Sequence, residues 1–119
     1  MSQQNDTGVI SLIAGAALNQ YDLVKMDGAT FRQVIVTGAG DATIGSTRVA
    51  AESGKDIGVN LIKSKPGTII AIADGVVAVN ADCYTGAAGT VSATILGSII
   101  GTALNAASAA GDHVEILPA

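Results

Sequence analysis

Hydrophobic and polar residues alternate over short stretches of this chain, a pattern that predicts β-strands. The clearest examples are residues 21–26 (YDLVKM) and 31–36 (FRQVIV), which are separated by the turn sequence DGAT at 27–30. Asp and Gly supply the backbone conformations that a tight turn needs, so the two stretches are expected to pair as a hairpin. In the first stretch, Leu23 and Val24 fall on opposite faces.

Further strands are expected wherever a short apolar run lies between turn residues. Residues 37–46 contain three glycines in ten positions and are expected to form a loop. Residues 68–79 are expected to form two strands around a tight turn, or one strand with a bulge at Gly75. Residues 105–111 (NAASAAG) are expected to be a loop or a short helical link. The other expected strands are 57–62, 90–96, 98–104 and 112–117, the last with Val114 and Ile116 inward and His113 and Glu115 outward.

The number and spacing of these strands indicate the fold class. Eight to ten short strands separated by Gly, Asp, Asn and Pro turns are typical of a small all-β barrel or sandwich. A length of 119 residues allows one such domain. We expect a polar N-terminal arm at residues 1–10 and a single β domain at residues 11–119.

One strand–link–strand pattern occurs twice. Residues 57–72 (IGVNLIKSKPGTIIAI) and 99–117 (IIGTALNAASAAGDHVEIL) both contain Ile-Gly-x-x-Leu, a link, and an alternating strand that starts at glycine. Two equivalent strand pairs would suit a pseudo-symmetric barrel, in which glycine permits a close approach of two backbones.

The composition suggests that much of the surface is covered by a partner. Only 13% of the residues are charged, against about 25% in an ordinary soluble domain. Hydrophobic residues make up 49% of the chain, but many of them are alanine, which buries little area. Such a surface is poorly solvated, so another protein or further copies of the chain are expected to cover it.

Charge and cysteine content argue against several classes of protein. The net charge is −4, the six cations are scattered, and aromatic residues are scarce, so direct nucleic-acid binding is not expected. The lone Cys83 excludes an internal disulfide and is expected to be a small buried residue. No Lys or Arg precedes the apolar run at 9–18, so no secretory signal is expected. Residues 83–111 are uncharged and long enough for a membrane span, but their glycines and polar residues make this a minor alternative.

The residues that carry catalytic chemistry are too few for an active site. His113 is the only histidine and is expected to be solvated on the outside of its strand. The glycine-rich segment 38–45 lacks the ending of a phosphate-binding loop. We therefore expect no enzyme, no metal and no cofactor. Most of the aspartates are expected to bond backbone N–H groups in turns: Asp22, Asp27, Asp41, Asp74, Asp82 and Asp112.

The order of these short motifs resembles the small capsid decoration, or cement, proteins of tailed bacteriophages and related prophages. The resemblance spans roughly residues 15–117. It is weakest at residues 80–94 and before Val9, where this chain departs from the family pattern. The matching positions are Val24 and Lys25; Ile57, Gly58 and Val59; Gly67 to Ile72 with Gly75 and Val76; Ile100, Gly101, Ala103 and Leu104; and Gly111 to Leu117.

The resemblance implies a non-enzymatic protein that is made in the host cytoplasm and binds the outer surface of the capsid. Many copies, commonly trimers, would clamp neighbouring major capsid subunits, with no membrane or nucleic acid involved. Multivalent binding would give avidity although each contact is weak. The arm would order on the capsid, and Val9 and Ile10 would add to the sheet edge of a neighbour. The expected interface residues are Ser2, Gln3, Gln4, Asn5, Asp6, Thr7, Gly8, Val9 and Ile10.

Two other functions remain open from the sequence. The first is a virion structural or fibre-base module that displays another domain. The second is a small membrane protein, which depends on residues 83–111 alone.

Overall fold

The computed structural model describes residues 9–28, 32–62, 67–97 and 99–119. Within these residues the chain forms ten short strands and one 3-10 turn, so the predicted small all-β fold is confirmed. The elements are β1 (Val9–Ala14), β2 (Leu23–Met26), β3 (Gln33–Val36), β4 (Gly45–Thr47), β5 (Asp56–Leu61), β6 (Ile69–Ile72), β7 (Asp82–Thr85), η1 (Ala87–Gly89), β8 (Val91–Ser92), β9 (Gly101–Ala103) and β10 (His113–Pro118).

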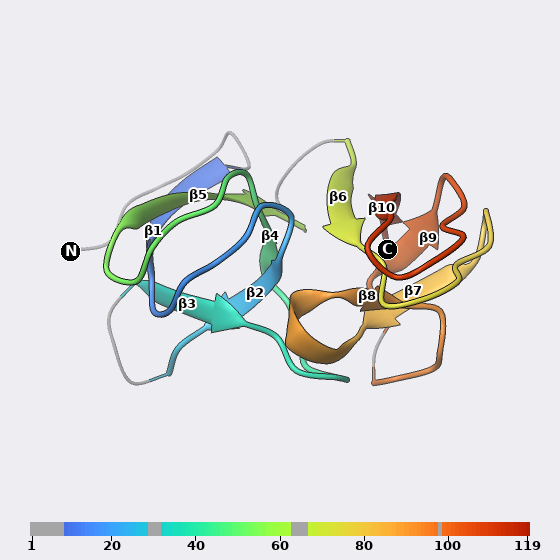
Figure 1. Cartoon of the computed structure of the whole chain (residues 1–119), viewed down its shortest axis with the longest axis horizontal. Coiled ribbons are helices and arrows are strands. Elements are labelled where there is room, and N and C mark those ends of the chain that lie inside the picture. The colour runs from blue at the N-terminus through green and yellow to red at the C-terminus, as the bar shows by residue number, and fades with distance from the viewer. Residues whose placement is uncertain (1–8, 29–31, 63–66, 98) are drawn as a thin grey trace.

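The strands form two halves that lie side by side along the longest axis of the molecule (Figure 1). Strands β1 to β5 close into a barrel with the order β1-β3-β2-β4-β5. Strands β6 to β10 form a curled five-stranded sheet with the order β6-β10-β9-β7-β8. Each half encloses its own cluster of buried aliphatic side chains.

Several predicted elements are present. Strands β2 and β3 pair antiparallel, with Val24 opposite Val36, so the predicted hairpin is confirmed. Part of its turn lies outside the described residues. In β10, Val114 and Ile116 are fully buried while His113 and Glu115 are exposed, as the alternation predicts.

Other predictions of secondary structure were wrong. The expected loop at 37–46 contains the start of β4, because Gly45 and the residue after it pair with β2 and β5. Residues 73–79 form no strand, since β6 ends at Ile72. Strand β7 was not predicted, because its sequence DCYT does not alternate. The loop at 105–111 contains no helix and is held instead by an isolated bridge between Ala107 and Val77.

The two halves are structural duplicates of each other. Strands β1 and β5 pair with Leu12 opposite Ile57, and β6 and β10 pair in the same way with Ala71 opposite Val114. The remaining pairings, β2 with β3 and β4 in the first half, recur as β7 with β8 and β9 in the second. Even the parallel contact that closes the barrel recurs as a single bridge between Ala73 and Val91. One architecture is therefore built twice.

This duplication corrects the repeat expected from the sequence. Residues 57–72 are not the counterpart of 99–117, because β5 and β6 lie in different sheets whereas β9 and β10 pair directly. The true counterpart of 99–117 is residues 43–60 (TIGSTRVAAESGKDIGVN), which contain β4, the following loop and β5 up to Asn60. The predicted pseudo-symmetry is thus present, but between different segments.

A leucine side chain of the first barrel packs into the hydrophobic cluster of the second half. Leu23 points away from the inside of its own barrel and is fully buried in the hydrophobic cluster of the second half. Its neighbour Val24 points into the first barrel and belongs to that cluster. Both faces of β2 are therefore buried, one inside the barrel and one at the junction.

Candidate functional site

Three of the aspartates expected in turns do bond backbone N–H groups. The Asp22 carboxylate accepts the N–H of Asn19 at 2.9 Å, and that of Asp112 accepts the N–H and hydroxyl of Ser108 at 2.9 and 3.0 Å. Asp41 accepts the N–H of Gly38 at 2.8 Å. These side chains stabilise loops, and their acceptor atoms are already used within the chain.

The pKa of Asp22 predicts an unusual effect of pH on stability. Burial raises the pKa of this carboxyl above its ordinary value, against the opposing effect of the hydrogen bond from Asn19. Ionisation therefore favours the unfolded state, and stability is lost as the pH rises through the raised pKa. Because an amide oxygen can still accept the Asn19 N–H, Asp22→Asn is expected to be more stable than the wild type at pH 7, with no difference at acid pH. Urea unfolding measured across this pH range tests the prediction.

Asp112→Asn is the matched control, because its shift has the opposite sign. The hydrogen bonds from the Ser108 N–H and hydroxyl and from the Ala109 N–H lower the pKa of Asp112. This stabilisation exists above the ordinary carboxyl pKa and is lost as the pH falls through the lowered one. The Asp112 variant is expected to be less stable than wild type at pH 7. A loss of stability at pH 7 in the Asp22 variant would contradict the prediction.

The single cysteine and the single histidine do not form a reactive pair. Cys83 is buried, as expected, and burial raises the pKa of its thiol to about 11, so it is protonated at neutral pH. His113 is exposed on β10, where its ring and the Tyr21 ring form a T-shaped pair with a centroid distance of 5.0 Å. Among the described residues, no group of three or more His, Cys, Asp or Glu could hold a metal ion.

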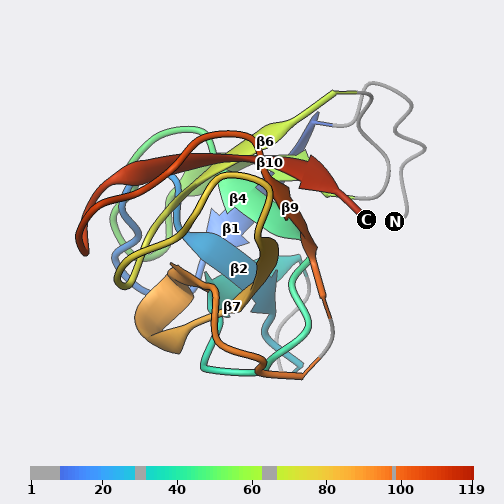
Figure 2. The same cartoon turned by 90° about the vertical axis from the view of Figure 1, so that its right-hand side faces the viewer.

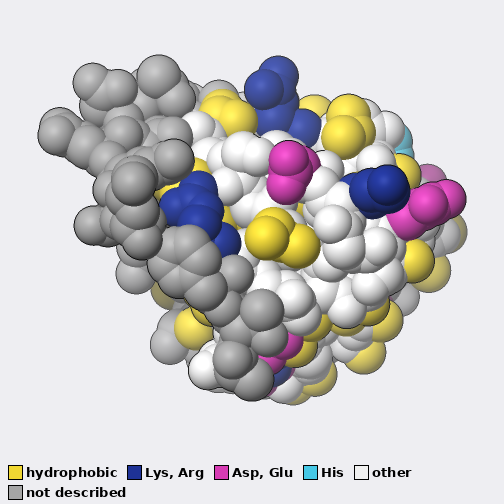
Figure 3. Space-filling model, turned by 90° about the vertical axis from the view of Figure 1, so that its left-hand side faces the viewer, with side chains coloured by type: hydrophobic (Ala, Val, Ile, Leu, Met, Phe, Trp, Pro, Cys, Tyr) yellow, Lys and Arg dark blue, Asp and Glu magenta, His cyan; other side chains and the backbone are white. Residues whose placement is uncertain are grey.

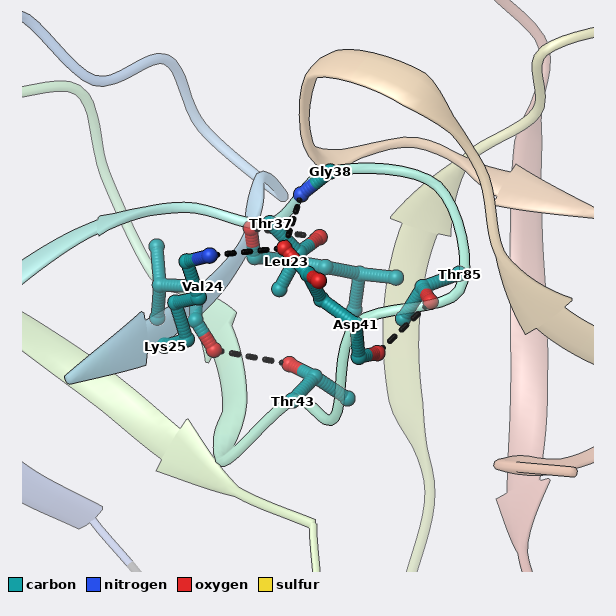
Figure 4. Close-up of polar contacts among 8 residues, drawn as sticks. All are labelled: Leu23, Val24, Lys25, Thr37, Gly38, Asp41, Thr43 and Thr85. Carbon is teal, nitrogen blue, oxygen red and sulfur yellow. Dashed lines mark hydrogen bonds and ion pairs between the residues drawn. The ribbon is translucent and has the colours of Figure 1, made fainter. Parts of the chain in front are cut away.

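The glycine-rich segment at 38–45 connects the two halves (Figure 4). The Asp41 carboxylate accepts a hydrogen bond from the Lys25 ammonium at 2.7 Å and another from the Gly38 N–H. These two bonds lower the pKa of Asp41. The backbone of the same loop bonds β7, since the Thr85 hydroxyl donates to the Asp41 carbonyl at 2.7 Å and Gly40 N–H donates to the Thr85 carbonyl at 3.0 Å. The segment is a structural connection, and its polar groups are engaged.

A hollow of about 260 Å³ lies beside this connection. Its walls are the loop between β3 and β4, Ile62 at the end of the first half, and Ile99, Ile100 and Ala119 of the second half. The Thr43 hydroxyl on its wall donates to backbone carbonyls of the same chain, those of Val24 and Gly45. Asp41 also lines the hollow, and its carboxylate is bonded to Lys25 and to the Gly38 N–H.

Of the expected capsid-interface residues, the structure describes only Val9 and Ile10; Ser2 to Gly8 lie outside the described residues. Val9 and Ile10 belong to β1, where they pair with Asn60 and Val59 of the same chain. One edge of this strand is thus already occupied within the chain and is not open for pairing with a neighbouring subunit. The boundary expected after residue 10 falls inside β1.

Large hydrophobic side chains are exposed mainly in the second half of the described chain. The first half exposes Met26 and Val49. This uneven distribution fits the expectation that a partner covers part of the surface. The exposed side chains of the second half are Val76, Val79, Ile95, Ile99, Leu104 and Leu117.

No helix within the described residues is long and apolar enough to cross a membrane.

Comparison with known proteins identifies a similar fold among solved structures. No protein-family model matches the chain, and no curated protein matches its sequence. Among solved structures, the chain is similar to the head fiber gp8.5 N base in bacteriophage phi29, with a TM-score of 0.79 and 17% sequence identity. The match covers 93% of this chain and 92% of that chain. The two chains share a fold that includes both duplicated halves.

Proposed function

We propose that this chain is a structural protein of a tailed-bacteriophage head, bound to the outer surface of the capsid. The observation that carries the proposal is the shared fold with a phage head fiber base, which extends over nearly the whole of both chains. The motif order that resembles capsid decoration proteins supports the same location. The role is structural and not enzymatic, with the major capsid protein as partner.

Two roles on the capsid follow from the two similarities. As a cement protein, the chain would clamp neighbouring capsid subunits as a symmetric oligomer, with a trimer as the favoured state. As a fibre base, it would attach a further domain to the head, a role favoured by the solved neighbour's own description as a fiber base. Both roles require binding to the capsid, but only the first requires stabilisation of it.

Purified protein added to capsids that lack it is expected to co-sediment with expanded, DNA-filled heads and to saturate at a fixed ratio to the major capsid protein. Many symmetric sites that each bind weakly produce such a saturable signal. A cement protein would also raise the temperature at which the heads release DNA, whereas a fibre base would leave it unchanged.

A deletion of residues 2–8 tests the proposed role of the N-terminal arm in capsid binding. It leaves β1 intact, whereas a deletion reaching Ile10 would remove part of a barrel strand. Reduced occupancy by this variant, with unchanged unfolding temperature, supports the proposed role of the arm. Failure of the full chain to co-sediment with any capsid form would contradict the proposed function.

A further inference from the structure

The outer face of β9 and β10 carries a group of exposed aliphatic side chains. Val79, Leu104 and Leu117 are 60%, 44% and 50% exposed. Leu104 lies across from Glu115 on β10, to whose carbonyl its N–H donates at 2.8 Å, and Leu117 lies two residues further along that face. The residue after Val79 donates to the carbonyl of the residue before Leu104 at 2.7 Å, which brings Val79 to the same place. In Figure 2 these strands lie in front of the first half.

The duplication identifies which residues occupy these positions in the first half. Arg48 N–H donates to the Gly58 carbonyl at 2.9 Å, which is the counterpart of the bond between Leu104 and Glu115. The first-half residues equivalent to these three exposed aliphatic side chains are all polar. The counterparts are Gln20 for Val79, Arg48 for Leu104 and Asn60 for Leu117.

In the first half, this face packs against the second half of the same chain. Arg48 and Asn60, together with Val9 and Tyr21, line a hollow that also borders Thr68 and the first two residues of β6, Ile69 and Ile70. Strand β4 contacts β6, and the two halves lie edge to edge there (Figure 1). Within the described residues, the corresponding face of β9 and β10 has no further half to pack against. In the duplication, the counterpart of β6 is β1.

We propose that the outer face of β9 and β10 binds the outer face of β1 in a second copy of this chain, head to tail, in an arrangement that repeats the packing of the two halves. Outward positions of β1 form the receiving face: Ser11, which is exposed, and Ile13, which is half-buried. Val9, the next outward position, lines the hollow between the two halves of the same chain.

The two halves differ in net charge. All six Lys and Arg residues lie in residues 1–65 with six of the ten acidic residues, so that part has no net formal charge, whereas the second half contains only acidic formal charges. The receiving face is not purely cationic, because Asp56 on β5 lies across from Ile13. Arg32 donates to the Ser11 backbone carbonyl at 2.6 Å, which places its guanidinium beside β1. Glu115 and Asp82 lie on the opposing face, and both are exposed. On the end of the molecule formed by the first half, both basic and acidic side chains lie among hydrophobic ones (Figure 3).

The contact between copies differs from the contact between halves at one position. Asp82 is the counterpart of Leu23 in the duplication. At the internal junction Leu23 enters the core of the second half, but Asp82 cannot enter the core of a second copy in the same way. The interface is therefore limited to the strand faces, and a reversible association results. A heterologous contact of this kind closes into a ring when its rotation permits, and the proposal thus specifies the interface of the symmetric oligomer invoked above.

The first experiment measures the mass of the full chain by sedimentation velocity over a range of concentrations. The wild type is expected to associate, and Leu104→Arg/Leu117→Asn, which installs the first-half residues, is expected to weaken association by about tenfold or more. Ile95→Thr is the control, since it removes an even more exposed aliphatic side chain, 78% exposed, outside this face. Circular dichroism and unfolding temperature establish that each variant folds. A wild type that remains monomeric, or a double variant that associates like wild type, overturns the proposal.

A mixing experiment tests the head-to-tail arrangement. Ser11→Glu places a carboxylate on the exposed centre of the receiving face, where Glu115 and Asp82 of the next copy would repel it. This variant retains an intact β9–β10 face, and the Leu104/Leu117 variant retains an intact β1 face. Each variant alone is expected to be monomeric, and an equal mixture is expected to form heterodimers and nothing larger. A mixture that stays monomeric overturns the arrangement.

Because these measurements use no capsid, they can fail independently of the proposed function. Capsid binding by a chain that never self-associates would overturn this inference and leave the capsid role in place.

Discussion

Gly45→Ala is expected to lower the free energy of unfolding by about 3 kcal/mol or more, the largest effect of any substitution considered. Gly45 lies in β4, between β2 and β5, and a Cβ atom built on it overlaps the backbone carbonyl of Asn60 in β5. A backbone group held in a barrel cannot move aside as a flexible side chain can. Urea unfolding followed by circular dichroism measures the loss.

The duplicate position supplies a second test of the same cause. A Cβ on Gly101 overlaps the Leu117 carbonyl in β10, which is the counterpart of Asn60. Gly101→Ala is therefore expected to be similarly costly. Gly75→Ala is the control, because nothing lies within 4 Å of its added Cβ, and it should change stability by less than about 0.5 kcal/mol. An unfolding midpoint for Gly45→Ala equal to that of Gly75→Ala would contradict this account.

Leu23→Ala is expected to lower the free energy of unfolding by about 2–5 kcal/mol. The Leu23 side chain is fully buried in the cluster of the second half, although it belongs to a strand of the first barrel. Its truncation leaves a cavity at the junction, where relaxation would require the two halves to shift together. Chemical denaturation measures the loss. Hydrogen exchange is expected to show faster opening in both halves.

Leu104→Ala serves as the control for Leu23→Ala. The same chemical change at a half-exposed side chain removes little buried area from the monomer, so the free energy of unfolding should change by less than about 1 kcal/mol. Faster hydrogen exchange in only one half of the Leu23 variant would show that Leu23 does not couple the halves.

The duplicated architecture would suit the proposed role of binding at repeated positions on a capsid. One half buries a strand face against the other, and the proposed contact between molecules uses the second copy of that face. In that proposal, the same strand order provides both the internal junction and the surface for assembly.

The sequence predicted the elements whose residues carry local signals. Strand β10 alternates strictly, and Val114 and Ile116 are buried as predicted. The β2–β3 hairpin follows from its turn residues, and the all-β class follows from the spacing of short strands. Strand β7 was missed because its sequence does not alternate.

The pairing of strands that lie far apart in the sequence was decided by the tertiary structure. The repeated Ile-Gly motif was visible, but its partner was sought at Ile57 when it lies at Ile44 and Gly45. Similar short apolar strands fit many registers, so local sequence cannot select between them. Only the pairing of β4 with β5, and of β9 with β10, identifies the equivalent segments.

For the candidate binding surface too, the sequence predicted only part of what the tertiary structure shows. Composition alone predicted a poorly solvated surface and a partner to cover it. The sequence did not distinguish Leu23, which is fully buried, from Leu104, which is exposed, because both are leucines in or next to a short strand. Burial depends on what packs against the outer face of a strand. That face is covered by the second half at β2 and open at β9 and β10, a difference set by the tertiary arrangement of two copies of one fold.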